Sequence, residues 1–170
     1  MTRQAPARRG FSMVEIMITV TILAIIGALA APMLSPNHTT KLRSAASLLA
    51  ADLDACRAES IAHGEDTRVI VFDTDAEAYH LAPSSDPNTP LDHPTSGGEY
   101  TVQFGITETA QLKGVTIQSV SVGGDDQLGF GIYGQLDQTT DATITLESGG
   151  ITLTLTLDAA TGEVSIGELQ

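Results

Sequence analysis

The residue whose position most needs a chemical explanation is Glu15. It is the one charged side chain in the run from Phe11 to Leu34. A carboxylate at membrane depth costs about 2.5–3.5 kcal/mol on insertion scales. Such a group becomes tolerable when a positive charge pairs with it. The pattern therefore predicts that Glu15 is kept for an electrostatic pairing.

The other side chains that could do chemistry are spread along the chain. Cys56 is the only cysteine and the histidines form no His-x-x-x-His pair, so we expect no zinc site. Asp73 with Asp75, and Asp125 with Asp126, could supply oxygen ligands for calcium, but neither pair belongs to a full ligand string. We interpret both pairs as solvated turn residues. The four histidines are His38, His63, His80 and His93.

No catalytic motif accompanies these residues. The sequence contains no Gly-x-Ser-x-Gly, phosphate loop or dinucleotide fingerprint. Ser148 and Ser165 have no general base at a recognisable spacing. We therefore expect that the chain is not an enzyme and takes no cofactor, metal or small-molecule substrate.

The segment that carries Glu15 has the length of a membrane span. The 24 residues from Phe11 to Leu34 would form a helix of roughly 36 Å, against about 30 Å of hydrocarbon. Three arginines lie in the polar residues 1–10, while Lys41 and Arg43 follow the run. This bias places the N-terminus in the cytoplasm and the rest of the chain across the membrane.

A cleaved secretory signal peptide is the alternative, and it would make the chain a secreted β-rich binding protein. Ala28-Leu29-Ala30 fits its cleavage pattern. Against it, the apolar run from Ile16 to Ala31 is at the long end for a signal peptide, and Glu15 lies at the start of that run. A disposable segment has no reason to carry that charge.

The segment Gly10-Phe11-Ser12-Met13-Val14-Glu15 resembles the processing motif of type IV prepilins and pseudopilins. The resemblance implies that a prepilin peptidase cleaves after Gly10 and that Phe11 becomes a methylated N-terminus. Glu15 would then pair with the Phe11 ammonium of a neighbouring subunit. It also implies an inner-membrane protein with a periplasmic domain, whose partners are other pilins or pseudopilins and an inner-membrane assembly platform.

Four small residues follow within the same run. Ala24, Gly27, Ala28 and Ala31 have the small-xxx-small spacing that lets helices approach closely in lipid, although ordinary membrane-helix composition explains them equally well. Pro32 removes a backbone donor and can kink the helix.

A second helix is expected over 41–63, at the start of a globular domain 41–170. It follows a polar, Pro-bearing hinge at 35–40 and ends before Gly64. Lys41, Arg43, Asp52, Asp54 and Glu59 lie off its apolar stripe. That stripe consists of Leu42, Ala46, Leu49, Leu53, Cys56 and Ser60.

The β-rich part, 68–170, is typical of short strands. The clearest is 151–157, where Ile151 and three leucines alternate with Thr and should share one buried face. A Pro-rich loop at 82–99 is the best candidate for partner contact. Strands are also expected at 68–72, 77–81, 100–106, 115–122, 128–133, 142–146 and 163–166.

The distribution of charge excludes one class of partner. The formal net charge is −13, and residues 69–170 contain one basic residue, Lys113, against fifteen acidic ones. Nucleic-acid affinity depends on Lys and Arg beside phosphates, so we expect no nucleic-acid partner. The negative field instead favours a basic partner surface.

The order of the elements is similar to that of the GspH/FimT family, which includes minor pseudopilin H of type II secretion. A helix over 46–59 leads into 68–72, and the patterns at 130–134 and 161–164 follow. Members often carry Arg where this chain has Glu163. The resemblance implies an α+β pilin-like fold, with a long N-terminal helix packed on antiparallel sheets. It also implies a minor pseudopilin or, alternatively, a minor type IV pilin.

Overall fold

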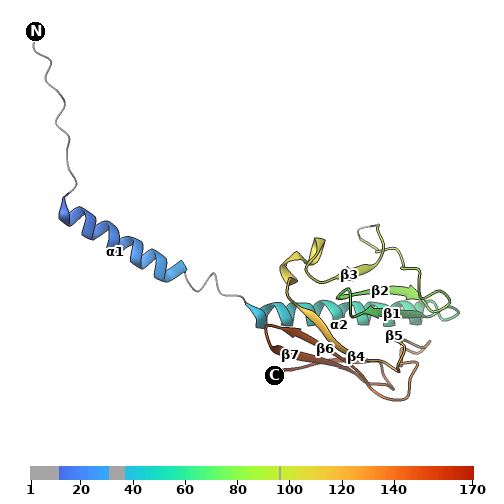
Figure 1. Cartoon of the computed structure of the whole chain (residues 1–170). Coiled ribbons are helices and arrows are strands. Elements are labelled where there is room, and N and C mark those ends of the chain that lie inside the picture. Colours follow the sequence, from blue (N-terminus) through green and yellow to red (C-terminus); the bar gives the residue numbers. More distant parts are fainter. Residues whose placement is uncertain (1–11, 31–36, 96) are drawn as a thin grey trace, which may run out of the picture. The chain divides into compact units, whose positions relative to one another are not determined.

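The computed structural model describes residues 12–30, 37–95 and 97–170. The chain divides into two compact units, residues 1–36 and 37–170 (Figure 1). Among the described residues, the first unit contains helix α1, Met13–Ala30, and the second contains helix α2, His38–Ala62, followed by strands and one short 3-10 helix. The fold is α+β, as the sequence predicts.

Helix α2 begins inside the segment that was predicted to be a hinge. His38, Thr39 and Thr40 are helical, and the Lys41 amide donates to the Asn37 carbonyl over 3.0 Å. The predicted hinge over 35–40 is therefore wrong for 38–40, because this hydrogen bond already closes the first helical turn.

The predicted apolar stripe of α2 is confirmed, since all six of its residues are buried. The prediction for Asp52 is wrong. Its side chain was expected to lie off the buried stripe, but the residue is only 7% exposed. The cause is tertiary: the hydroxyls of Tyr79 and Tyr100 reach its carboxylate.

The first antiparallel sheet has the strand order β3-β2-β1-β5. Strand β1 pairs with β2 along its whole length, from Arg68 opposite Pro83 to Asp73 opposite Ala78. The two strands thus form a hairpin. The bounds are Arg68–Asp73 for β1, Ala78–Pro83 for β2, Thr101–Gln103 for β3 and Gln127–Gly129 for β5.

The second antiparallel sheet has the order β4-β6-β7-β8. Strands β6 and β7 are joined by a two-residue turn, Gly149-Gly150, with φ of 62° and 81°. Glycine suits this turn because both central residues of a tight hairpin need positive φ. The bounds are Thr116–Ser121 for β4, Ala142–Ser148 for β6, Ile151–Leu157 for β7 and Val164–Leu169 for β8.

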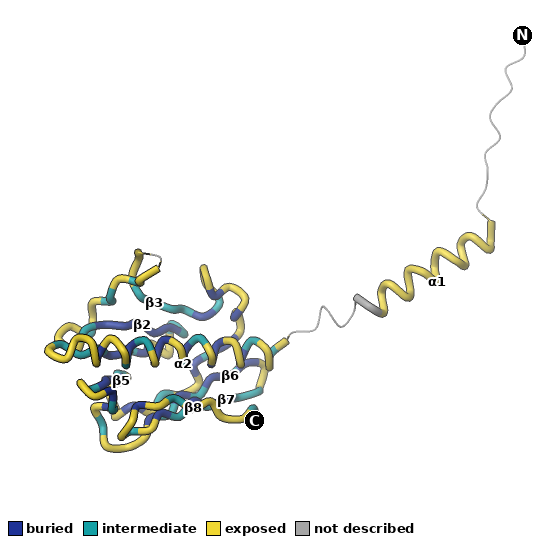
Figure 2. Tube along the Cα trace, turned by 180° about the vertical axis from the view of Figure 1, so that it is seen from behind, coloured by how far each residue is buried: buried dark blue, intermediate teal, exposed yellow. Residues whose placement is uncertain are grey.

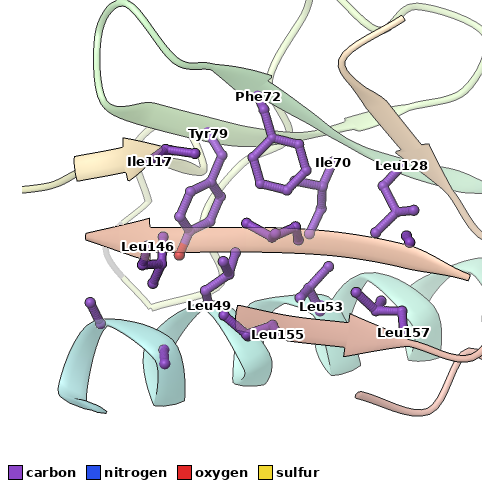
Figure 3. Packing of buried hydrophobic residues seen from close by; sticks show 14 of the residues in the cluster. Leu49, Leu53, Ile70, Phe72, Tyr79, Ile117, Leu128, Leu146, Leu155 and Leu157 are labelled. Carbon is purple, nitrogen blue, oxygen red and sulfur yellow. The ribbon is translucent and has the colours of Figure 1, made fainter. Parts of the chain in front are cut away.

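The core of residues 37–170 lies between α2 and the two sheets. Leu49 and Leu53 of α2 meet Ile70 of the first sheet and Leu155 and Leu157 of the second (Figure 3). Along α2, buried and exposed positions alternate with the helical period (Figure 2). The buried stripe of α2 therefore packs against both sheets.

Two predicted strands are shorter than expected. The strand over 100–106 stops at Gln103, because Gly105 and Thr107 adopt positive φ, and the 3-10 helix η2, Thr107–Leu112, follows. The strand over 128–133 stops at Gly129, where a turn takes over. On β7, Leu153, Leu155 and Leu157 are buried as predicted, whereas Ile151 is only half-buried at the end of its strand.

Candidate assembly site

Glu15 lies in the first turn of α1, the position where a carboxylate suits the positive end of the helix dipole. It is the only ionisable group between residues 12 and 30. Its side chain is exposed, and no other group of α1 pairs with it. Thr19 and Thr21 donate their hydroxyls to carbonyls of their own helix, at 2.9 and 2.7 Å. Glu15 is therefore the one polar group of α1 without a partner on its own helix.

The small residues lie on the opposite side of α1 from Glu15. Nine residues separate Glu15 from Ala24, which is about 180° around a helix of 3.6 residues per turn. Gly27 and Ala28 lie on the same side as Ala24, and nothing approaches a Cβ built on Gly27 within 4 Å. A neighbour that reaches Glu15 and one that packs on the small residues would thus contact different faces.

Four of the residues assigned to this site lie outside the described part of the chain: Gly10, Phe11, Ala31 and Pro32. The processing junction and the expected kink therefore stay predictions. Within the described ranges 12–30, 37–95 and 97–170, no helix is both long and apolar enough to cross a membrane.

The second candidate surface is the loop predicted at 82–99, which runs between Pro83 and Thr101 in the structure. Its first residues are tied to the α2–β1 connection by Asp66. The Asp66 carboxylate accepts hydrogen bonds from the Ser85 amide at 3.1 Å and the Ser85 hydroxyl at 3.0 Å. These bonds, the Ser85 amide first among them, lower the pKa of Asp66.

The end of the same loop is tied to α2 by Asp52. Tyr79 donates to one Asp52 oxygen over 2.6 Å and Tyr100 to the other over 3.0 Å. Burial raises the pKa of Asp52, while the two tyrosine hydrogen bonds and the charge of His93 oppose that shift. Burial and the nearby carboxylate raise the pKa of Tyr100, so it stays a donor. Two phenols thus hold a buried carboxylate beneath the loop.

Between these two anchors the loop is also bonded to β2. The Leu91 amide donates to the Leu81 carbonyl of β2 over 2.8 Å, and within the loop the Tyr100 amide donates to the Leu91 carbonyl over 2.6 Å. His80 makes a 2.9 Å hydrogen bond to the Pro87 carbonyl. The loop is therefore held at its start, its middle and its end, which the Pro-rich sequence does not reveal.

A groove of about 510 Å³ separates this loop from α2. Leu81 and the Tyr100 ring contribute to its lining, which is more apolar than polar. The walls are formed by Ala55, Ala58 and Glu59 of the helix and by Leu91, Asp92 and Pro94 of the loop.

Arg57 fastens the other flank of α2. Its Nε donates to the Gly134 carbonyl over 3.1 Å. Gly162 packs so closely against that carbonyl that a Cβ at position 162 would collide with it. The loops that carry the patterns at 130–134 and 161–164 thus meet beside one arginine, although they are far apart in sequence.

One pair of residues differs from the sequence analysis. Ser148 was described as having no base at a recognisable spacing, yet His38 Nδ1 lies 3.0 Å from its hydroxyl oxygen. Ser148 is 2% exposed and donates its only proton to the Gly114 carbonyl over 2.9 Å. Since that proton is already used, the imidazole acts as the donor and ties α2 to β6.

The acidic turns act as local caps. Asp73 accepts hydrogen bonds from the amides of Asp75 and Ala76, at 3.1 and 2.9 Å, and Asp125 accepts one from Gln127 at 3.4 Å. Among the residues that the structure describes, no group of three or more His, Cys, Asp or Glu side chains could hold a metal ion.

The N-terminal motif is also found by comparison with known families. The profile described as "Prokaryotic N-terminal methylation motif" matches residues 6–31, which include Gly10, Phe11 and Glu15. A search of curated proteins finds no match.

Two solved structures resemble the fold. The minor pilin FimU of Pseudomonas aeruginosa gives a TM-score of 0.52 at 16% identity, covering 76% of this chain and 90% of that one. The minor pseudopilin EpsH of Vibrio cholerae gives a TM-score of 0.54 at 14% identity, covering 75% of this chain and 96% of that one. The fold is type IV pilin-like. Motif and fold together agree with the resemblance to the GspH/FimT family.

The sequence analysis did not predict the cluster around Asp52, and its assignment of assembly residues stays a prediction. A signal for Asp52 exists, because it stands three residues after Leu49 and four before Cys56, beside the buried stripe. Its tyrosine partners are 27 and 48 residues away, and no local pattern connects them to α2.

Proposed function

We propose that the chain is a minor pseudopilin of a type II secretion pseudopilus. It is inserted with its N-terminus in the cytoplasm, cut after Gly10, and recruited through α1 into a periplasmic filament. There it helps to initiate or cap the filament that drives protein export across the outer membrane. Its partners are the prepilin peptidase, the inner-membrane assembly platform and the other pseudopilins.

The observation that carries this proposal is the state of α1. The described side chains of residues 12–28 are exposed in the single chain, and those from Ile16 on are apolar or small apart from two threonines. Exposed apolar surface of this extent marks a membrane or protein contact. Glu15 adds a charge that a neighbour's N-terminal ammonium, created by cleavage before Phe11, would neutralise. The matched methylation motif supports the same reading.

A minor type IV pilin is the second candidate, because the likeness to FimU is about as close as that to EpsH. Loss of the chain from its host separates the two. We expect export of secreted proteins to fail while surface pili remain. Normal export with missing pili would favour the second candidate.

The proposed function is tested first by the mass of the mature protein from its native host. We expect a chain that begins at methylated Phe11, and Gly10→Val should leave the precursor uncut. A mature chain beginning at Ala31 would instead favour the secreted β-rich protein, because Glu15 would be discarded.

The second test is Glu15→Ala. The variant should be processed normally yet be lost from filaments isolated from the host. Thr21→Val is the matched control, since it changes a polar residue of α1 whose hydroxyl bonds only within the helix. Normal assembly of Glu15→Ala would overturn the pairing of Glu15 with a neighbour. The expectation that the chain is not an enzyme stays a prediction.

A further inference from the structure

The groove between α2 and the loop after β2 has walls that are held in place without a ligand. On one side stands the C-terminal third of the 25-residue helix α2. On the other side the loop is tied down by Asp66 at its start and by Asp52 at its end. A cleft of about 510 Å³ with such walls is preformed. A preformed cleft lowers the entropy cost of binding.

The lining combines an apolar surface with an acidic rim. Ala58 is exposed on the helix wall, and Leu81 and Leu91 lie in and beside the core. Glu59 and Asp92 stand on opposite walls, and Glu99 lies opposite Asp92 in an isolated antiparallel bridge. His63 lies at this rim, with its Nδ1 atom 3.1 Å from a carboxylate oxygen of Glu59. When protonated, His63 forms an ion pair with Glu59.

We propose that this groove binds a different protein, through a segment in which an apolar side chain stands beside a lysine or arginine. The apolar side chain would enter between Ala58 and Leu91. The cation would lie between Glu59 and Asp92, where two carboxylates face it from opposite walls. This inference rests on the proposed function only in placing that partner among the neighbouring subunits of the filament.

Charge disfavours a second copy of this chain as the occupant. From Val69 onward the chain has one basic residue against fifteen acidic ones. Of the earlier basic residues, Lys41 donates its ammonium to the Lys113 carbonyl over 2.9 Å, and Arg57 donates to the Gly134 carbonyl. Two such domains would bring like charges together, which costs affinity. A basic neighbour would gain from the same field.

The test places a photoreactive amino acid at Ala58 of the full chain, in the host that produces the complete assembly. We expect one adduct with another protein, and its cross-linked peptide should contain an apolar residue next to Lys or Arg. The same label at Ser165, which is exposed on β8 of the second sheet, should not yield that adduct.

Charge reversal makes the test specific. Asp92→Lys should lower the yield of the Ala58 adduct by about fivefold or more, because an exposed ion pair is worth up to roughly 1 kcal/mol and its reversal adds repulsion. Asp75→Lys is the matched control, since it changes the net charge equally at an exposed turn outside the groove.

Each other outcome contradicts the inference about the groove. An adduct with a second copy, an adduct peptide without a basic residue, or equal yields for the two reversals would overturn it. A chain that enters filaments in a Glu15-dependent way but gives no Ala58 adduct would overturn it too, leaving the proposed function intact. If the chain never enters filaments but gives the basic adduct, the proposed function fails and the groove inference stands.

Discussion

The two helices of this chain are stabilised in opposite ways. In α1 the apolar side chains point outward all round, so that Ile22 is 51% and Leu23 67% exposed in the single chain. In α2 a stripe of mostly small and medium residues is fully covered, with Leu49 and Leu53 at 0% exposure. The more apolar helix is the uncovered one.

The contrast teaches where each helix obtains its packing. α2 finds it within the chain, because two sheets close on one stripe. Among the described residues of its own unit, residues 12–30, α1 has no other element to pack against. Under the proposed function, lipid and neighbouring subunits would cover it. Stability measurements on a single chain should therefore respond to α2 and not to α1.

The largest expected effect is on the α2 core. Leu53→Ala should lower the free energy of unfolding by about 2–5 kcal/mol, because it removes methyl groups from a fully buried site and leaves a cavity. Ile22→Ala on α1 is the control and should change it by less than about 0.5 kcal/mol. Urea unfolding of the full chain in detergent measures both. Equal losses of unfolding free energy in the two variants would contradict the statement that α2, and not α1, is stabilised by packing within the chain.

The second prediction concerns the junction beside Arg57. Gly162→Ala should destabilise the fold by about 2–4 kcal/mol, because it adds a collision with the Gly134 carbonyl to the strain of positive φ. Gly150 also has positive φ, of 81°, but nothing lies within 4 Å of a Cβ built there. Gly150→Ala should therefore cost only about 1–2 kcal/mol. Equal losses in urea unfolding would show that the junction is not tightly packed.

The smallest effect is a pH dependence that arises at Asp52. Because burial raises the pKa of Asp52 in the folded chain, the folded state keeps a proton that the unfolded state releases above its ordinary pKa of 3.8. The contribution of Asp52 to the free energy of unfolding therefore falls as the pH rises from the pKa of the unfolded state through the pKa of the folded state. Asp52→Asn should remove that fall, as measured by thermal unfolding between pH 3 and pH 8.

Asp158 provides the opposite sign. Hydrogen bonds from Thr161, side chain first and then amide, lower its pKa in the folded chain. The contribution of Asp158 to stability is present above the pKa of the unfolded state and is lost as the pH falls through the pKa of the folded state. Asp158→Asn should therefore reduce the acid loss of stability. If the two variants shifted the pH profile in the same direction, these assignments would be wrong.

Much of the fold could be predicted because periodicity follows from burial. The α2 stripe was predicted correctly, and so was the β7 alternation for Leu153, Leu155 and Leu157, since these side chains face one continuous core. The strand at 100–106 was too long because Gly105 and Thr107 adopt positive φ, and the strand at 128–133 was too long because a turn follows Gly129. An alternating pattern of apolar residues does not predict where such a turn ends the strand.

In the candidate site, too, some features were predicted from the local sequence and others depend on tertiary contacts. Glu15 was predicted from one charge in an apolar run, and that signal needs no tertiary information. The buried Asp52 and the groove beside Ala58 were not predicted. The Asp52 carboxylate is held by Tyr79 and Tyr100, and Tyr100 also lines the groove, so both features depend on residues that the fold brings to α2 from elsewhere in the chain.

The sequence by itself determined what lies along one helix or one strand: the uncovered apolar character of α1, the charge within it, and the face that α2 buries. These depend on the order of residues and on the period of the backbone. Only the tertiary structure decided which distant residues meet, because strand pairing and core closure place them there. The Asp52–Tyr100 contact, the Arg57 junction and the acidic groove all belong to that second class.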